Sequence, residues 1–343
     1  MKKKPVIIFS LIVLVALILV LAVYRVISGS VTVADGERAV IYIPEGSSYA
    51  QVMDSVKSAG LMIENKMILD WIAGKKGYPQ RIRPGRFVVE KSMSYSGFIN
   101  MLRSGRQSPV NVTFNNIRTI NDLAGVVSKQ IEADSADIVA FFCNPANYSG
   151  DGFTGETILS LFIPDTYELY WNTDPAKFYA RMLREYNRFW NDKRLQQADK
   201  IGLTGPEVST LASIIDHETT KADEKPLIAG VYLNRLKRGI PLQADPTIKF
   251  AVNDFTMNRI LNKHLLIDSP YNTYKYKGLP PGPITCPSIE SIDAVLNAAV
   301  HDYLFFAARP DFSGYHNFSR TLREHNRNAA MYQRELNRRK IFN

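Results

Sequence analysis

The sequence predicts an α+β protein with one N-terminal transmembrane helix, then a small strand–helix–helix–strand unit, then a mixed α/β domain. Three observations support this prediction: an uncharged N-terminal run, short alternating segments typical of strands, and longer segments with apolar residues at helical spacing. With 343 residues the chain is long enough for two domains, and its hydrophobic content of 45% is ordinary for a globular protein.

The N-terminal run is the clearest physical signal. After a lysine triplet at 2–4, residues 5–24 carry no charge and are mostly Ile, Leu and Val. A helix of this length spans about 30 Å, enough to cross a bilayer core. The alternative, a cleaved signal peptide, has a shorter apolar region and a small-residue cleavage site, which this run lacks. We predict a cytoplasmic tip at 1–4 and a single uncleaved transmembrane helix at 5–27. Lysines next to a transmembrane helix favour the cytoplasmic side, so the lysine triplet should keep the N-terminus in the cytoplasm and place the rest of the chain outside.

The charge balance excludes one class of partner. The formal net charge is +9, and four of the positive charges lie within the first 25 residues, which hold no acid. The mild excess on the remainder suits an acidic polymer or an anionic surface. No stripe of Lys and Arg is interleaved with aromatic residues, so we expect no nucleic acid as a partner.

Signatures of a metal or cofactor are also missing from the sequence. His217 and Glu218 begin an H-E-x-x-H pattern, but Lys221 stands where the second His would be required. No two of the five histidines have i, i+4 spacing, and no glycine-rich phosphate loop is present, so we predict no cofactor and no metal site. Cys143 and Cys286 belong to no C-x-x-C pair, which leaves two free thiols or one disulfide open.

Two segments share one order of elements. In the first, a strand at 39–43 is followed by a helix from Ser47 or Ser48 to Gly60, a helical pattern at 67–72 and a strand at 85–89. This order resembles a LysM module, which binds amino sugars, and we assign residues 28–105 to such a LysM-like unit. The order recurs weakly with a strand at 110–114, helices at 119–127 and 136–142, and a segment at 163–167.

Helical patterns dominate from residue 175 onward, and one of them carries a candidate acid. In the helix predicted at 206–219, Leu211, Ile214, Ile215 and Glu218 fall at i, i+3, i+4 and i+7. A carboxylate that continues an apolar stripe is partly desolvated, which raises its pKa toward the value a general acid needs. Asp216 lies about 200° round the helix from Glu218. The alternative is that Glu218 lies at a frayed helix end and pairs with a nearby lysine.

Polar and aromatic residues downstream form a candidate sugar-binding set. Amides, carboxylates and hydroxyls suit sugar hydroxyl groups, and aromatic rings provide stacking platforms. The candidates are Asn234, Gln243, Asp245, Thr247, Tyr271, Asn272, Thr273, Tyr274 and His316. Local Asx or ST turns and ordinary core packing are the alternative uses of these side chains.

Several ordered motifs carry a resemblance to a known family. They are the segments 211–219 (LASIIDHET), 228–236 (IAGVYLNRL), 242–247 (LQADPT), 270–274 (PYNTY), 278–284 (GLPPGPI), 316–318 (HNF) and 164–167 (PDTY). Through them the sequence resembles the endolytic murein transglycosylases of the YceG-like family. The resemblance implies a catalytic domain at 106–343, with Glu218 as its catalytic acid. It also implies cleavage of the MurNAc–GlcNAc β-1,4 bond within peptidoglycan strands to give 1,6-anhydroMurNAc ends.

The same resemblance implies a cellular context. The chain would be a single-pass protein of the cell (inner) membrane, with its catalytic domain in the periplasm or extracytoplasmic space. Its partners would be peptidoglycan strands, the membrane, and penicillin-binding proteins of the wall-synthesis machinery. Two departures from the family pattern matter: Asp216 shortens the usual first Glu of Glu-Lys-Glu-Thr, and residues 115–119 replace an acid–Gly turn.

Two other functional classes stay open. A hydrolase could use Glu218 together with Asp245, because hydrolysis of a glycosidic bond generally takes two carboxylates. A catalytically silent glycan-binding or scaffold protein of wall synthesis is the third reading.

Overall fold

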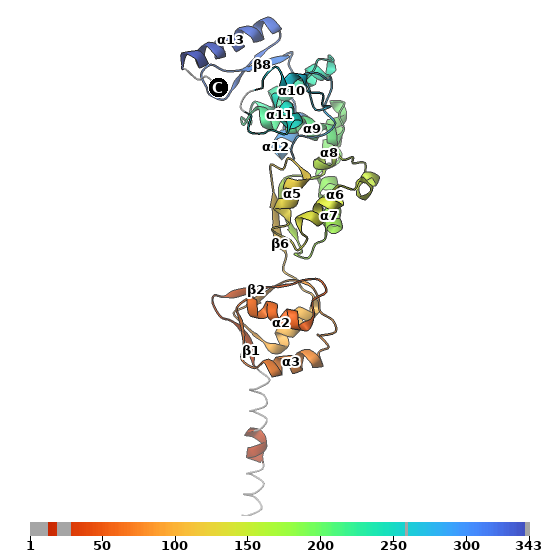
Figure 1. The fold of residues 1–343 in the computed structure, drawn as a ribbon, viewed down its shortest axis with the longest axis vertical. Coiled ribbons are helices and arrows are strands. Elements are labelled where there is room, and N and C mark those ends of the chain that lie inside the picture. Colours follow the sequence, from red (N-terminus) through yellow and green to blue (C-terminus); the bar gives the residue numbers. More distant parts are fainter. Residues whose placement is uncertain (1–12, 19–28, 258–259, 340–343) are drawn as a thin grey trace, which may run out of the picture. The chain divides into compact units, whose positions relative to one another are not determined.

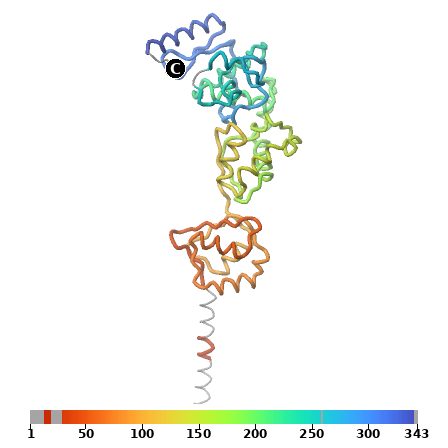
Figure 2. Tube along the Cα trace, viewed as in Figure 1, coloured from red at the N-terminus to blue at the C-terminus, as the bar shows by residue number. Residues whose placement is uncertain are grey.

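A computed structural model describes residues 13–18, 29–257 and 260–339. Within this part of the chain the protein is α+β, with small sheets of two or three strands among short helices. Among the described residues, no helix has both the length and the apolar character to cross a membrane. Only 13–18, which are helical, represent the predicted span at 5–27, so that prediction falls mainly outside the described residues. The chain divides into two compact units (Figures 1 and 2).

The first unit is mainly Met1–Val112. Its elements are β1 (Ser30–Val33), β2 (Arg38–Ile43), α2 (Tyr49–Ser58), β3 (Leu61–Ile63), α3 (Lys66–Lys75), β4 (Gly85–Glu90), β5 (Ser92–Ser94) and α4 (Tyr95–Ser104). The predicted strand–helix–helix–strand order is present as β2, α2, α3 and β4. Ser48 caps α2 through a capping box, as the sequence indicates.

The sheet β2–β4 forms one side of the core of this unit. The two strands pair antiparallel from Arg38 opposite Glu90 to Ile43 opposite Gly85. Alternate residues face inward, so Ile41 and Phe87 are fully buried with Val52 and Val56 of α2. Burying such aliphatic and aromatic side chains stabilises the unit by roughly 1.5–3 kcal/mol each.

A second sheet, β3–β1–β5, was not expected from the sequence. Its central strand β1 pairs antiparallel with β3 and with β5. Strands of three or four residues carry too few alternations to be distinguished from loop. The helix α4 follows β5 directly, and Phe98, Ile99 and Leu102 of this helix join the core.

The second strand–helix–helix–strand order is also present. It consists of β6 (Val110–Phe114), α5 (Ile120–Val127), α6 (Ser135–Phe142) and β7 (Asp165–Leu169), and β6 pairs with β7. Thr119 caps α5 with a capping box. Three short 3-10 helices precede β7, namely η1 (Pro145–Asn147), η2 (Ser149–Asp151) and η3 (Ile158–Leu161). The recurrence of elements predicted from the sequence is therefore confirmed.

The remaining elements form the larger part of the second unit. They are α7 (Pro175–Phe189), α8 (Asp192–Lys200), α9 (Gly205–Glu218), α10 (Lys225–Lys237), α11 (Asp245–Val252), η4 (His264–Leu266), α12 (Ile289–Leu296), β8 (Phe305–Ala308), β9 (His316–Ser319) and α13 (Leu322–Arg338). Helices α9, α10 and α12 meet in one hydrophobic cluster (Figure 1). The hairpin β8–β9 packs beside α13, which has no fully buried residue.

Candidate active site

Glu218 is the last residue of α9, and the helix determines where it points. Thr204 caps α9 with a capping box, so the helix begins at Gly205 as predicted to within one residue. Leu211, Ile214 and Ile215 are fully buried. Because Glu218 continues their stripe by one turn, its carboxylate lies where the hydrophobic core meets the surface, as the helical phase predicts.

The Glu218 carboxylate has an unusual electrostatic environment. Burial raises the pKa of Glu218 to about 7, and the charge of Asp245 acts in the same direction. The hydroxyl of Tyr232 on α10 donates a hydrogen bond of 2.7 Å to Oε1, which opposes that rise. A pKa near neutrality lets one carboxyl group both give and take a proton.

Two cavities border Glu218. The first, of about 350 Å³, is lined by Tyr232, Gln243, Asp245, Tyr274 and Phe305 among others. The second, of about 360 Å³, is lined by Thr219, Ala308, Arg309, Tyr315 and His316 among others. Both also contain residues of α13, with Leu322 and His325 in the first and Tyr332 in the second. One carboxyl group is therefore accessible from two adjoining hollows of the surface.

Three of the predicted sugar-binding residues line the first cavity. Gln243 has a left-handed backbone with φ of 52°, and its side-chain oxygen accepts a hydrogen bond of 3.2 Å from Arg235. Asp245 begins α11 and accepts a hydrogen bond of 2.5 Å from the hydroxyl of Tyr274. An amide, a carboxylate and a phenol thus lie beside the Glu218 carboxyl group.

His316 lies in the second cavity and has a buried partner. Its backbone N–H donates to one oxygen of Glu224 at 2.7 Å, and its Nδ1 lies 2.9 Å from the other oxygen. Glu224 is 3% exposed. This pair holds the imidazole against the segment between α9 and α10 and fixes one wall of the second cavity.

The structure places the other five predicted residues within the fold, outside both cavities. The amide of Asn234 donates to the carbonyls of His301 and Tyr303, and Tyr271 packs its ring 4.6 Å from that of Phe250. Thr247, Asn272 and Thr273 are buried. The hydroxyls of Thr247 and Thr273 lie 2.8 Å apart and connect α11 to the segment at 272–273, and the amide of Asn272 donates to the carbonyl of Ile267. Their assignment to sugar binding stays a prediction.

Asp216, two residues before Glu218, has a different role. Its carboxylate accepts hydrogen bonds from the N–H and hydroxyl of Ser288, from the hydroxyl of Ser291 and from Lys225 at 3.2 Å. Lys225 is buried and also contacts Glu290 at 2.7 Å. Since Ser288 caps α12 and Lys225 begins α10, Asp216 joins the ends of three helices.

The site residues predicted from the sequence did not include Tyr232 and Arg235, which also line the first cavity. Tyr232 is 1% exposed and Arg235 is 7% exposed, and both contribute to the cavity wall. The guanidinium of Arg235 donates to the carbonyl of Leu242 at 2.6 Å. Ile228, Tyr232 and Arg235 lie at i, i+4 and i+7 on one face of α10. Arg235 therefore continues an apolar stripe with a polar group, which is the same pattern that identified Glu218.

The described residues contain neither a cluster of metal ligands nor a disulfide. No group of three or more His, Cys, Asp and Glu side chains in 13–18, 29–257 and 260–339 could hold a metal ion. Cys143 is exposed and Cys286 is buried, and both are free thiols. The question of their pairing, which the sequence left open, is thereby answered.

The fold and the site together define an α+β protein with one carboxyl group of near-neutral pKa between two surface cavities. The chain belongs to the YceG-like family, whose family model matches residues 41–331. It is 28% identical over 313 residues to the endolytic murein transglycosylase of Bacillus subtilis (strain 168), covering 85% of this chain and 84% of that protein.

Two further relatives agree. The endolytic murein transglycosylase of Streptococcus pneumoniae serotype 2 (strain D39 / NCTC 7466) is 27% identical over 319 residues, with 84% of this chain and 57% of that protein covered. A crystal structure of a YceG-like protein from Listeria monocytogenes superposes with a TM-score of 0.55 at 25% identity. It covers 85% of this chain and 98% of the other. The family suggested by the sequence motifs is confirmed.

Proposed function

We propose that this chain is an endolytic lytic transglycosylase that cleaves the MurNAc–GlcNAc β-1,4 bond within peptidoglycan strands. The single observation that carries the proposal is the carboxyl group of Glu218, half-buried, with a pKa of about 7, at the border of two cavities. The relatives that bear the name endolytic murein transglycosylase support the same activity.

The proposed reaction needs only one protein carboxyl group. Protonated Glu218 donates its proton to the glycosidic oxygen while the bond from that oxygen to the muramoyl C1 breaks. The C6 hydroxyl of the same muramoyl residue attacks C1, and its proton passes to the Glu218 carboxylate. The products are a 1,6-anhydro end and a free 4-hydroxyl, and no water is consumed. Because the nucleophile belongs to the substrate, the entropic cost of bringing it to C1 is small.

The two cavities fit a strand that is cut internally. An endolytic enzyme must hold sugar units on both sides of the bond that it breaks, and Glu218 lies on the border of two hollows of similar volume. We propose that one hollow holds the muramoyl side and the other the leaving side. Tyr232 would orient the carboxyl group through its 2.7 Å hydrogen bond.

A hydrolase is the second candidate, because Asp245 lines the same cavity as Glu218. A hydrolase would use Asp245 as base or nucleophile and would add water to the muramoyl C1. Digestion of purified peptidoglycan, followed by mass spectrometry of the new ends, separates the two. We expect anhydro ends, one water lighter than reducing ends, with wild-type protein and none with Glu218→Gln. Reducing ends lost in Asp245→Asn would establish the hydrolase instead.

The cellular setting is part of the proposal. We propose that residues 5–27 anchor the chain in the cell membrane, with 1–4 cytoplasmic and the catalytic domain at 106–343 in the extracytoplasmic space. The unit at 28–105 would act as a LysM-like glycan-binding module, and penicillin-binding proteins are the proposed partners. The lysine triplet and the uncharged run support the anchor. A mature N-terminus mapped beyond residue 25, or a cytoplasmic C-terminal reporter, would refute this topology.

A further inference from the structure

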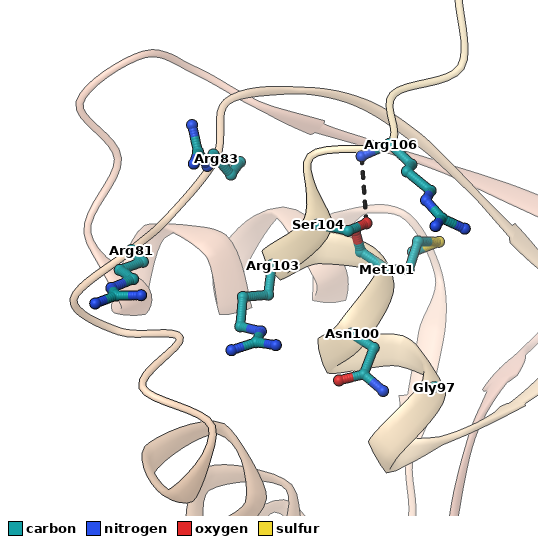
Figure 3. A pocket seen from close by; sticks show the side chains of 8 residues that line it. All are labelled: Arg81, Arg83, Gly97, Asn100, Met101, Arg103, Ser104 and Arg106. Atoms are coloured by element: carbon teal, nitrogen blue, oxygen red, sulfur yellow. Dashed lines mark hydrogen bonds between the residues drawn. The ribbon is translucent and has the colours of Figure 1, made fainter.

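The first unit contains a cavity that the proposed reaction does not use. Its volume is about 540 Å³, larger than either cavity beside Glu218. Four arginines line it, Arg81, Arg83, Arg103 and Arg106, and the other lining residues are uncharged. Figure 3 shows Arg81 and Arg83 on the loop between α3 and β4, and Arg103 and Arg106 at and just beyond the end of α4.

The local charge is segregated along the chain. Residues 74–107 contain eight Lys and Arg and one acid, Glu90, whereas residues 29–73 contain three Lys and Arg and six acids. Glu90 already contacts Arg38 at 3.1 Å. Across the described residues, the four arginines of the cavity form no ion pair within 4 Å. Acids were therefore available in the same unit, but the fold keeps them away from this cavity.

The backbone brings the two pairs of arginines together. Gly105 ends α4 in the left-handed conformation with φ of 68°, which turns the chain back toward the loop. A Cβ at Gly105 would lie 3.4 Å from the side chain of Arg83, so this turn packs closely against the loop. The amide oxygen of Asn100 accepts a hydrogen bond of 2.8 Å from Lys76, which leaves its NH2 group as a further donor at the cavity.

We propose that this cavity binds a phosphate-bearing ligand, held by the four guanidinium groups. Guanidinium groups bind phosphate oxygens with paired hydrogen bonds. A carboxylate brings one negative charge and two oxygens, whereas a phosphate group brings up to two charges and three oxygens. Four like charges around one hollow repel one another, and a multiply charged anion relieves that repulsion best. The phosphate can belong to a lipid headgroup or to a soluble phosphate compound.

The test uses the full chain in neutral detergent, titrated with inorganic pyrophosphate in a calorimeter. Two variants each remove two charges from the cavity: Arg81→Gln/Arg83→Gln on the loop side and Arg103→Gln/Arg106→Gln on the helix side. A matched control, Arg38→Gln/Lys57→Gln, removes two charges from exposed positions of the same unit that do not line the cavity. Every substituted residue is exposed, and circular dichroism melting checks that each variant folds.

We expect both cavity variants to bind pyrophosphate roughly 10-fold or more weakly than wild type, and the control to bind nearly as wild type. Binding should weaken as ionic strength rises. No binding to wild type, equal losses in all three variants, or acetate and an acidic peptide binding as tightly as pyrophosphate would each overturn the proposal.

A second arm identifies the source of the phosphate. Wild type and variants are mixed with vesicles of phosphatidylglycerol, and with phosphatidylcholine vesicles as reference. If the cavity variants lose binding to the phosphatidylglycerol vesicles, the ligand is a lipid headgroup. If they lose only pyrophosphate binding, the ligand is a soluble phosphate compound. Activity toward peptidoglycan is measured alongside. None of the four arginines lines the cavities beside Glu218, so the proposal of phosphate binding is judged by the two binding arms and not by turnover.

Discussion

The surroundings of Asp216 and of Glu218 differ more than their separation of two residues suggests. Asp216 accepts hydrogen bonds from Ser288, Ser291 and Lys225, so its carboxylate is saturated with donors. Glu218 accepts one side-chain hydrogen bond, from Tyr232, and burial raises its pKa to about 7. The comparison shows that the carboxylate that joins the ends of three helices is surrounded by hydrogen-bond donors from two of them. The carboxylate that faces the cavities keeps a pKa at which it can exchange protons.

The largest effect should come from Glu218→Gln. The amide keeps the shape and can still contact Tyr232, but it cannot deliver a proton. We expect turnover of peptidoglycan to fall roughly 10²–10⁴-fold or more, since general acid–base catalysis typically contributes that much. Release of anhydro ends measures the loss, and a glycan-binding assay should show nearly unchanged affinity.

The same substitution should also change stability in a pH-dependent way. The pKa of Glu218 is higher in the folded protein than the ordinary value of 4.5, so the folded state binds this proton more tightly. The stability from that proton is fully present below pH 4.5 and is lost as pH rises through about 7. The loss amounts to roughly 3 kcal/mol. Relative to wild type, Glu218→Gln should therefore be more stable at pH 8 than at pH 4.5.

Thermal melts of both proteins across this range provide the test. The difference in melting temperature should grow between pH 4.5 and 7 and then level off. A constant difference would mean that the carboxyl group of Glu218 is not desolvated, and the contrast with Asp216 would lose its basis.

Asp216→Asn should affect folding more than chemistry. Losing the carboxylate leaves buried Lys225 with Glu290 alone and weakens the bonds to Ser288, which should cost about 2–3 kcal/mol of unfolding free energy. Because the end of α9 would then be held less firmly, we expect turnover to fall about 10-fold. Urea unfolding and activity at a temperature where the variant is folded separate the two effects. A folded Asp216→Asn variant as inactive as Glu218→Gln would contradict the division of roles.

The smallest effect should come from Tyr232→Phe. Without the phenol, the ionised form of Glu218 loses a hydrogen bond worth roughly 1.5–3 kcal/mol, so its pKa should rise further above 7. The alkaline limb of the pH–activity profile should therefore move upward by roughly one unit, with a modest loss of rate. Tyr271→Phe is the matched control, because its ring packs on Phe250 outside both cavities.

A result from that control would also decide an open prediction. An unchanged pH profile and unchanged substrate affinity in Tyr271→Phe would mean that this tyrosine serves the fold. Weaker glycan binding would support the sugar-binding assignment made from the sequence.

Much of the fold was predictable because it depends on local signals. Capping residues and helical periodicity placed α2, α5 and α9 within a residue or two. The strands β1, β3 and β5 were not predicted, because runs of three or four residues contain too little alternation and are stabilised by partners elsewhere in the chain. The predicted sugar-binding residues fall into two groups. Gln243, Asp245, Tyr274 and His316 line the cavities beside Glu218, whereas the other five lie outside both cavities.

The sequence by itself determined which face of α9 carries a carboxyl group, since 3.6 residues per turn place Glu218 above Ile214 and Ile215 whatever packs against them. Only the tertiary structure decided what meets that carboxyl group and its neighbour. The donor to Glu218 comes from Tyr232 on the next helix, and the donor Ser288 reaches Asp216 across 72 residues of sequence. Such pairings depend on how helices pack in space, and periodicity along one helix contains no information about its partners.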